Sequence, residues 1–156
     1  MNPRFVVHEH HSSRLHFDFR LEMGGVLRSW AIPKGPSMNP SEKRLAIQVE
    51  DHPLDYIDFE GIIPEGGYGA GPVVIWDSGD YEMLGQRNDM IEFALRGKRL
   101  KGSFALVQLK GRGKGNEWLL IKKKDEYARL DWKLEISLTP KKKTRLKERI
   151  PPCQAS

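Results

Sequence analysis

Cysteine is almost absent from the chain of 156 residues: the only one, Cys153, lies three residues before the last. Without a second thiol no disulfide can form inside the chain, and a metal site made of several thiolates is excluded as well. Any metal ion that the protein binds must therefore take nitrogen and oxygen ligands from histidines and carboxylates.

Long apolar stretches are also missing. No run approaches the roughly 18 apolar residues that a membrane-spanning helix requires, and the first residues lack the charged, apolar and small segments of a secretory signal in their usual order. The sequence predicts a cytoplasmic protein with no membrane partner. Its 156 residues suit one domain with a core of its own.

Helical periodicity is scarce, and most segments between turn residues alternate apolar and polar side chains at the period of two that is typical of strands. A short helix is the alternative for Asn88–Arg96, although its apolar residues alternate. Many short strands favour an all-β, mainly antiparallel fold, in which a compact closed or partly closed barrel with little helix removes exposed strand edges. The predicted strands are Phe5–His10, Leu15–Glu22, Val26–Ile32, Arg44–His52, Val73–Trp76, Ile91–Leu95, Phe104–Leu109 and Trp118–Lys122.

Glycines mark three of the predicted turns. Gly24–Gly25 fits a two-residue hairpin, and Gly111–Asn116 fits a looser one. Glu65–Gly71 is rich in glycine, but no Gly-Lys-Ser/Thr follows it, so a tight loop is predicted there and not a phosphate-binding loop.

The formal net charge of +5 and the pI of 9.3 favour a polyanionic partner. Much of the excess lies after Pro140, where Lys141–Lys147 is a run of like charge with little to bury. We predict a barrel domain over residues 1–139 and a basic, flexible tail over residues 140–156. We interpret the tail as a solubilising end or a shortened linker, with a weak phosphate-binding arm as the alternative.

The strand Leu15–Glu22 carries the most informative pattern. Side chains two residues apart share a face of a strand, so leucines and phenylalanines fill one face. The other face presents His16, Asp18, Arg20 and Glu22. Imidazole and carboxylate groups bind divalent cations, and an arginine fork fits phosphate oxygens. The pattern indicates a metal-and-phosphate site, although a polar strand face is more often a solvated surface.

Four of the five histidines lie between positions 8 and 16. If Ser12–Arg14 forms the turn between the first two strands, His10 can join His16 and Asp18. Three protein ligands leave open positions for water or substrate, as a catalytic metal ion requires.

The fifth histidine, His52, ends the strand Arg44–His52. Side chains two residues apart share a face, so Leu45, Ile47 and Val49 are predicted on one face of this strand. The other face is predicted to be polar, with Arg44, Gln48, Glu50 and His52. The usual pKa of an imidazole, ~6.5, suits proton transfer near neutral pH.

Several motifs together resemble the 3′-phosphoesterase domain of the DNA ligase D family, in its stand-alone form. The resemblance runs in order from Phe5 to about Ala128. The segments that carry it are His10–Glu22, Ser29–Ser37, Val49–Tyr56, Phe59–Gly66 and Trp118–Lys122.

The resemblance implies an antiparallel barrel with a crescent-shaped polar site. It implies a Mn²⁺ cofactor, with Zn²⁺ or Co²⁺ as alternatives, and an enzyme that removes a 3′-terminal ribonucleoside from DNA or RNA and then the 3′-phosphate. A separate DNA ligase or polymerase is the expected protein partner. The implied metal ligands are His10, His16 and Asp18, the implied catalytic residues Arg20, His52 and Tyr56, and the further phosphate-binding residues Lys34, Arg44, Glu50 and His8.

Two departures from the family bear on this expectation. His8 stands where the family commonly has glutamine, at a position tied more to monoester than to diester cleavage. His8 therefore either weakens the monoester step or supplies another metal donor. Only four residues precede Phe5, so the family's N-terminal arm is expected to be largely absent. The alternative functions are a non-catalytic nucleic-acid-binding module and a metal enzyme for a small phosphorylated or carboxylated molecule.

Overall fold

The computed structural model describes residues 2–66, 69–111 and 113–152. Cys153, Gly67–Tyr68 of the glycine-rich loop and Arg112 of the predicted hairpin lie outside the described residues. The elements are β1 Arg4–His11, β2 Leu15–Met23, β3 Val26–Ile32, β4 Arg44–His52, the 3₁₀ helix η1 Leu54–Asp58, β5 Gly61–Ile63, β6 Gly71–Arg87, β7 Met90–Arg96, β8 Lys101–Gln108, β9 Glu117–Lys122 and α1 Pro140–Arg145.

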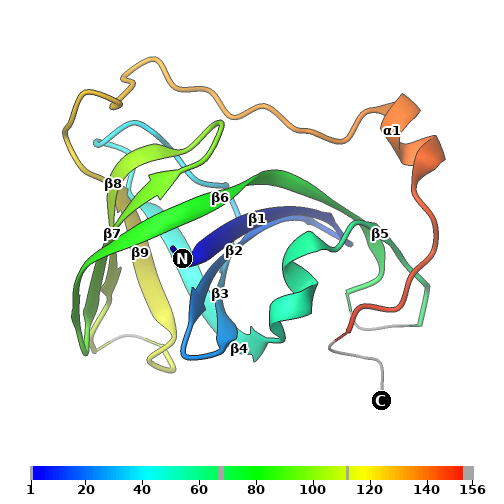
Figure 1. Cartoon of the computed structure of the whole chain (residues 1–156), viewed down its shortest axis with the longest axis horizontal. Coiled ribbons are helices and arrows are strands. Elements are labelled where there is room, and N and C mark those ends of the chain that lie inside the picture. The colour runs from blue at the N-terminus through cyan, green and yellow to red at the C-terminus, as the bar shows by residue number, and fades with distance from the viewer. Residues whose placement is uncertain (1, 67–68, 112, 153–156) are drawn as a thin grey trace.

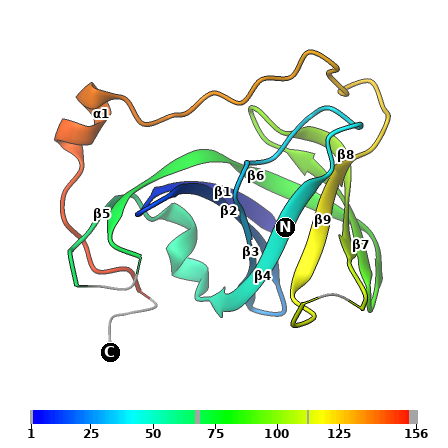
Figure 2. The same cartoon turned by 180° about the vertical axis from the view of Figure 1, so that it is seen from behind.

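Antiparallel pairing links the strands in the order β1-β2-β3-β4-β9-β8-β7-β6-β5. β1 also pairs with β6, which closes eight strands into a barrel and leaves β5 as an addition to β6 (Figures 1 and 2). The predicted all-β barrel is thus confirmed. In the described part of the chain, no helix is both long and apolar enough to span a membrane.

The strands differ from the predicted ones at β6. The predicted strand covers only Val73–Trp76, yet β6 runs from Gly71 through Gly79 to Arg87. A Cβ at Gly79 would lie 2.2 Å from the carbonyl oxygen of Arg96, so glycine lets the two strands approach closely where β6 follows the barrel. The helical alternative for Asn88–Arg96 is wrong, because Met90–Arg96 is β7.

Two apolar clusters lie on opposite sides of the barrel wall. The first fills the barrel and includes Phe17, Phe19 and Leu21 of β2, as the alternation in this strand predicts. The second lies under η1 and β5 on the outer face, and its members are Val6, Leu27, Tyr56, Ile57, Phe59, Ile63 and Val73. The outer side chains of β1 and β2 are therefore partly shielded from water rather than fully solvated.

The predicted polar face of β4 is wrong in part, because Arg44 and Gln48 do not share a face with His52. Gln48 pairs with the core residue Trp30, and Val49 pairs with Ser29 on the outer face. A register shift then follows, with two residues of β3 opposing three of β4, so that His52 pairs with Leu27. Strict alternation from Val49 would place Asp51 on the outer face. The extra residue, as in a β-bulge, places His52 there instead.

The segment after residue 139 lies beside β5. The backbone N–H of Ile62 donates to the carbonyl oxygen of Lys147 at 2.8 Å. The N–H of Arg149 donates to the carbonyl oxygen of Ile62 at 3.0 Å. These bonds form a parallel bridge between Ile62 and Glu148. The division of the chain at residue 140 stays a prediction.

Candidate metal and phosphate site

The register between β1 and β2 brings the three predicted metal ligands together. His10 lies opposite His16, and His8 lies opposite Asp18, all on the outer face. The Nδ1 of His10 is 3.5 Å from Oδ2 of Asp18, and the Nε2 of His16 is 3.3 Å from Oδ1. Ligand atoms of all three residues lie within 4.8 Å of one another.

Backbone carbonyls orient both imidazoles. The Nε2 of His10 is 2.6 Å from the Gly69 oxygen, and the Nδ1 of His16 is 3.1 Å from the Arg14 oxygen. A carbonyl only accepts, so these nitrogens carry protons. The opposite nitrogens face Asp18, where they donate to its carboxylate when protonated and offer a lone pair to a cation when deprotonated. Ligand atoms about 2.1 Å from one ion lie roughly 3.0–3.5 Å apart, so the arrangement fits a divalent cation.

The ionisation of Asp18 and His16 follows from these contacts. Burial alone would raise the pKa of Asp18, but the charge of Arg20 and the hydrogen bonds to His10 and His16 outweigh it and hold the pKa well below its usual range. The hydrogen bond to Asp18 raises the pKa of His16. Asp18 is therefore anionic at neutral pH, the form in which a carboxylate can bind a cation.

Arg20 is buried beside the metal ligands, with its guanidinium held on every edge. Its Nε donates to Nδ1 of His8 at 3.1 Å, and its Nη1 donates to Oγ of Ser29 at 2.9 Å. Its Nη2 lies 3.3 Å from Oδ2 of Asp18, and its Cζ lies 4.8 Å from the centre of the Tyr56 ring. The planar fork is pre-oriented for the oxygens of an anion such as phosphate.

His52 reaches the same group from β4. Its Nδ1 is 3.1 Å from Nη1 of Arg20 and 3.3 Å from Oγ of Ser29, and its ring stacks on Tyr56 at 5.2 Å. Burial, and then the charge of Arg20, lower the pKa of His52 to about 4. The imidazole is therefore neutral near pH 7, unlike the half-charged histidine that its unperturbed pKa suggests.

His8 lies beneath the site and uses both ring nitrogens. Nε2 is 3.1 Å from the carbonyl oxygen of Phe59, and Nδ1 accepts from Arg20. Burial, and then the charge of Arg20, hold the pKa of His8 well below its usual value. The alternative in which His8 is a further metal donor is not supported, because its contacts make it a support for Arg20.

An open pocket of about 580 Å³ lies over these residues. Among the other predicted site residues, Glu50 and Tyr56 line it, but Lys34 and Arg44 are not among the described lining residues. Arg44 lies 3.5 Å from Glu42 instead. The lining residues are His10, Ser12, Ser13, His16, Asp18, Arg20, Ala31, Val49, Glu50, His52, Tyr56, Ile63, Gly69, Ala70 and Pro151.

Sequence reasoning missed several residues of this site. Ser29 binds the guanidinium because it pairs with Arg20 across β2 and β3, a register that the Gly24–Gly25 hairpin could have indicated. The carbonyl oxygen of Gly69 accepts a hydrogen bond from Nε2 of His10, and a Cβ at Gly69 would lie 2.9 Å from Cε1 of that ring. No local pattern ties Gly69 to His10.

Comparison with known proteins identifies the family of the chain. The model of the DNA ligase D 3′-phosphoesterase domain matches residues 8–108. The multifunctional non-homologous end joining protein LigD of Pseudomonas aeruginosa is 53% identical over 81% of the chain, and that of Mycolicibacterium smegmatis is 45% identical over 80%. The chain spans only 16% and 17% of these relatives. On this similarity, the chain belongs to the DNA ligase D 3′-phosphoesterase domain family.

Proposed function

We propose that the protein is a divalent-metal-dependent phosphoesterase that heals 3′ ends of DNA or RNA. It removes a 3′-terminal ribonucleoside by diester cleavage and then the remaining 3′-phosphate, which leaves a 3′-hydroxyl for extension or ligation. The observation that carries this proposal is the convergence of His10, His16 and Asp18 beside the buried fork of Arg20 at the floor of an open pocket.

Each residue has a separate role in the proposed reaction. A bound Mn²⁺, or Zn²⁺ or Co²⁺ in its place, supplies Lewis-acid activation of a phosphate oxygen or of water. Arg20 uses one Nη2 hydrogen on Asp18, so the other can reach a phosphate oxygen and offset charge that develops on it.

His52 enters as a neutral imidazole, because its pKa is about 4. It is suited to accept a proton or to donate a neutral hydrogen bond, rather than to act as a charged acid in the free protein at pH 7. Tyr56 keeps this ring in place by stacking. Glu50 lines the mouth of the pocket.

The substrate class rests on the pocket and on the family. Apolar side chains of Ala31, Val49 and Ile63 share the pocket with the polar group, so a sugar or base can lie next to the phosphate that the polar group binds. The relatives are named as non-homologous end joining proteins. We therefore assign the activity to end joining in DNA repair, with a separate ligase or polymerase that takes over the product.

Two labelled primer-templates test the proposal, one that ends in a single ribonucleotide and one that ends in a 3′-phosphate. With Mn²⁺ we expect both to be converted, and with EDTA neither. Asp18→Ala and His16→Ala are expected to abolish conversion, whereas the matched control His11→Gln keeps it. Conversion by both Ala variants would refute the proposal, and metal-independent binding without conversion would favour a binding module.

A further inference from the structure

The net positive charge of the protein is concentrated in one short segment. Residues 141–149 contain six lysines and arginines and one glutamate, whereas the whole chain has a net charge of +5. The rest of the chain is therefore balanced in charge. Five of the six cationic side chains are exposed, namely Lys141, Lys143, Arg145, Lys147 and Arg149. We call residues 141–149 the basic segment.

Backbone pairing holds the basic segment on β5. The bonds of Ile62 to Lys147 and Arg149 add it to the free edge of that strand. Gly61 makes this approach possible, since a Cβ there would lie 3.0 Å from the Lys147 oxygen and 3.1 Å from Cδ of Arg149. The segment is thus fitted closely to the barrel.

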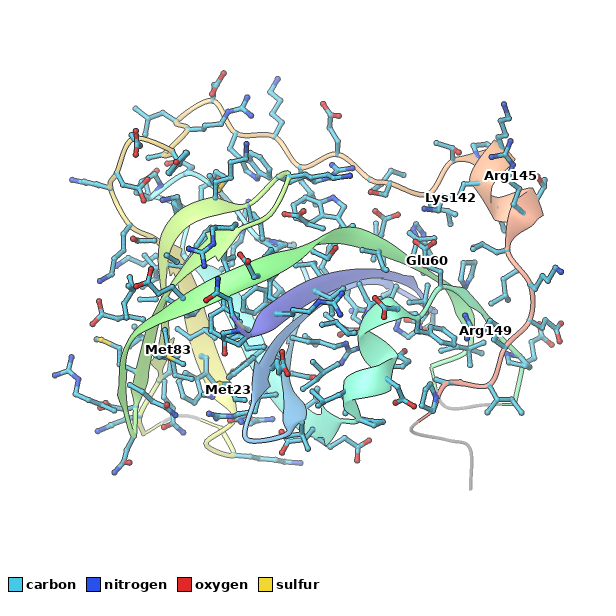
Figure 3. The ribbon with its side chains drawn as sticks, viewed as in Figure 1. Met23, Glu60, Met83, Lys142, Arg145 and Arg149 are labelled. Carbon is cyan, nitrogen blue, oxygen red and sulfur yellow. The ribbon has the colours of Figure 1, made fainter. Side chains whose placement is uncertain are left out.

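Side chains add to this attachment, and Figure 3 shows Lys142, Arg145 and Arg149 on the side of the molecule where Glu60 lies. The Nζ of Lys142 is 3.1 Å from Oε2 of Glu60, and that oxygen also accepts from the N–H of Ile75. Arg149 donates to the carbonyl oxygen of Glu60 at 3.1 Å, and its guanidinium lies 4.9 Å from the centre of the Phe59 ring.

The chain that leads into the segment is also anchored. The buried carboxylate of Glu9 accepts from the N–H groups of Ser137 and Leu138, the latter at 2.9 Å. Thr139 then caps α1 by accepting from the N–H of Lys142 at 3.1 Å. Glu9 directly precedes His10 in β1, but its side chain projects from the opposite face of the strand, so the chain reaches the basic segment from the face of β1 away from the candidate site.

The other end of the basic segment leads directly to the pocket. Pro151, two residues after Arg149, is buried and lines the pocket beside Ile63 and Ala70. On the β4 side the pocket is lined by Glu50, and Asp51 next to it is exposed as well. Carboxylates repel phosphates, so a polyanion that enters the pocket is favoured on the side of the basic segment.

We infer that the basic segment binds the backbone phosphates of the nucleic-acid strand whose 3′ end occupies the pocket. The inference rests on the proposed function for the identity of that strand. It assigns the positive charge of the protein to positioning of the substrate: the segment holds the nucleotides that precede the end, while the buried residues act on the end itself.

The test is the salt dependence of binding to a labelled single-stranded oligonucleotide with a 3′-hydroxyl end, in EDTA, so that no turnover is needed. The test variant is Lys141→Ala, Lys143→Ala and Arg145→Ala combined, which keeps Lys142 on Glu60. The control variant, Lys101→Ala, Lys114→Ala and Lys124→Ala combined, removes the same charge from exposed positions elsewhere. Thermal unfolding checks that both variants are folded.

We expect the test variant to lower the slope of log K against log salt by about 2, since each phosphate contact on a single strand contributes about 0.7. Affinity at low salt then falls on the order of tenfold, while the control stays near the wild type. Equal slopes for the two variants would overturn the inference.

Turnover is scored separately from binding. A dinucleotide with a 3′-terminal ribonucleotide is too short to follow the basic segment, so the test variant should convert it in Mn²⁺ at the wild-type rate. Absence of turnover in every protein, with the slope difference intact, would reject the proposed function alone. Turnover in every protein without the slope difference would reject the inference alone.

Discussion

Nη1 of Arg20 lies 3.1 Å from Nδ1 of His52, although the two residues are 32 positions apart in the sequence. The bulge in β4 brings His52 to this place. A permanent positive charge next to a half-buried imidazole disfavours its protonation. The contact therefore links the guanidinium that we propose binds phosphate to the charge state of His52, a pocket histidine outside the group of candidate metal ligands.

The first prediction concerns the protonation of His52. In the metal-free protein its ring is expected to titrate near pH 4, as followed by the chemical shifts of its ring protons in NMR spectra. In Arg20→Gln the pKa of His52 should rise, because the positive charge that lowers it is removed while the burial of the ring remains. A pKa of His52 near 6.5 in the wild type would contradict this description.

The same shift predicts how stability depends on pH. In the unfolded chain His52 binds a proton below its ordinary pKa of 6.5, and in the folded chain only below a pKa of about 4. Between these values the unfolded state binds more protons, so the contribution of His52 to stability is complete above pH 6.5 and is lost as the pH falls toward 4. Urea unfolding of wild type and His52→Gln at several pH values measures it, and identical pH profiles would argue against it.

His8 provides a prediction about support of the guanidinium. In His8→Gln an amide can still donate to the Phe59 oxygen and accept from Nε of Arg20, so stability and conversion of both primer-templates should stay close to the wild type. His8→Leu leaves that N–H and that carbonyl unsatisfied and should lower the free energy of unfolding by about 1–3 kcal/mol. Urea unfolding and initial rates measure both effects. If His8→Leu were as stable and active as His8→Gln, the proposed role would be wrong.

Gly69 tests the orientation of His10. A Cβ at Gly69 would lie 2.9 Å from Cε1 of that ring, so Gly69→Ala should tilt the imidazole and lower the affinity for Mn²⁺ by roughly 10- to 100-fold. Gly66→Ala is the matched control, because it has a similar positive φ of 88° with nothing within 4 Å of the added atom. Calorimetric titration with Mn²⁺ compares them, and equal losses would point to backbone strain instead.

The grouping of the three candidate metal ligands could be predicted from sequence because their geometry is local. Alternation in β2 separates Phe17 from His16 and Asp18, and a short turn returns β1 alongside, so His10 needs only the adjacent register. The barrel class followed from the same periodicity.

Other parts of the site depend on tertiary structure that no local pattern contains. The face of His52 is set by an extra residue in the pairing of β4 with β3, and strict alternation puts Arg44 and Gln48 beside it wrongly. The position of the basic segment depends on Gly61 and Ile62, far away in the sequence. A run of lysines alone predicts a solvated tail.

The central claim is that His10, His16 and Asp18 hold the divalent ion on which 3′-end cleavage depends. Its most direct test is titration of the metal-free protein with Mn²⁺ while cleavage of the ribonucleotide-ended primer is followed, in wild type and Asp18→Asn. In the wild type, activity should rise in proportion to one bound equivalent of Mn²⁺, whereas Asp18→Asn should show neither binding nor cleavage at those concentrations. Full cleavage in EDTA, or equal Mn²⁺ affinity and cleavage in the variant, would contradict it.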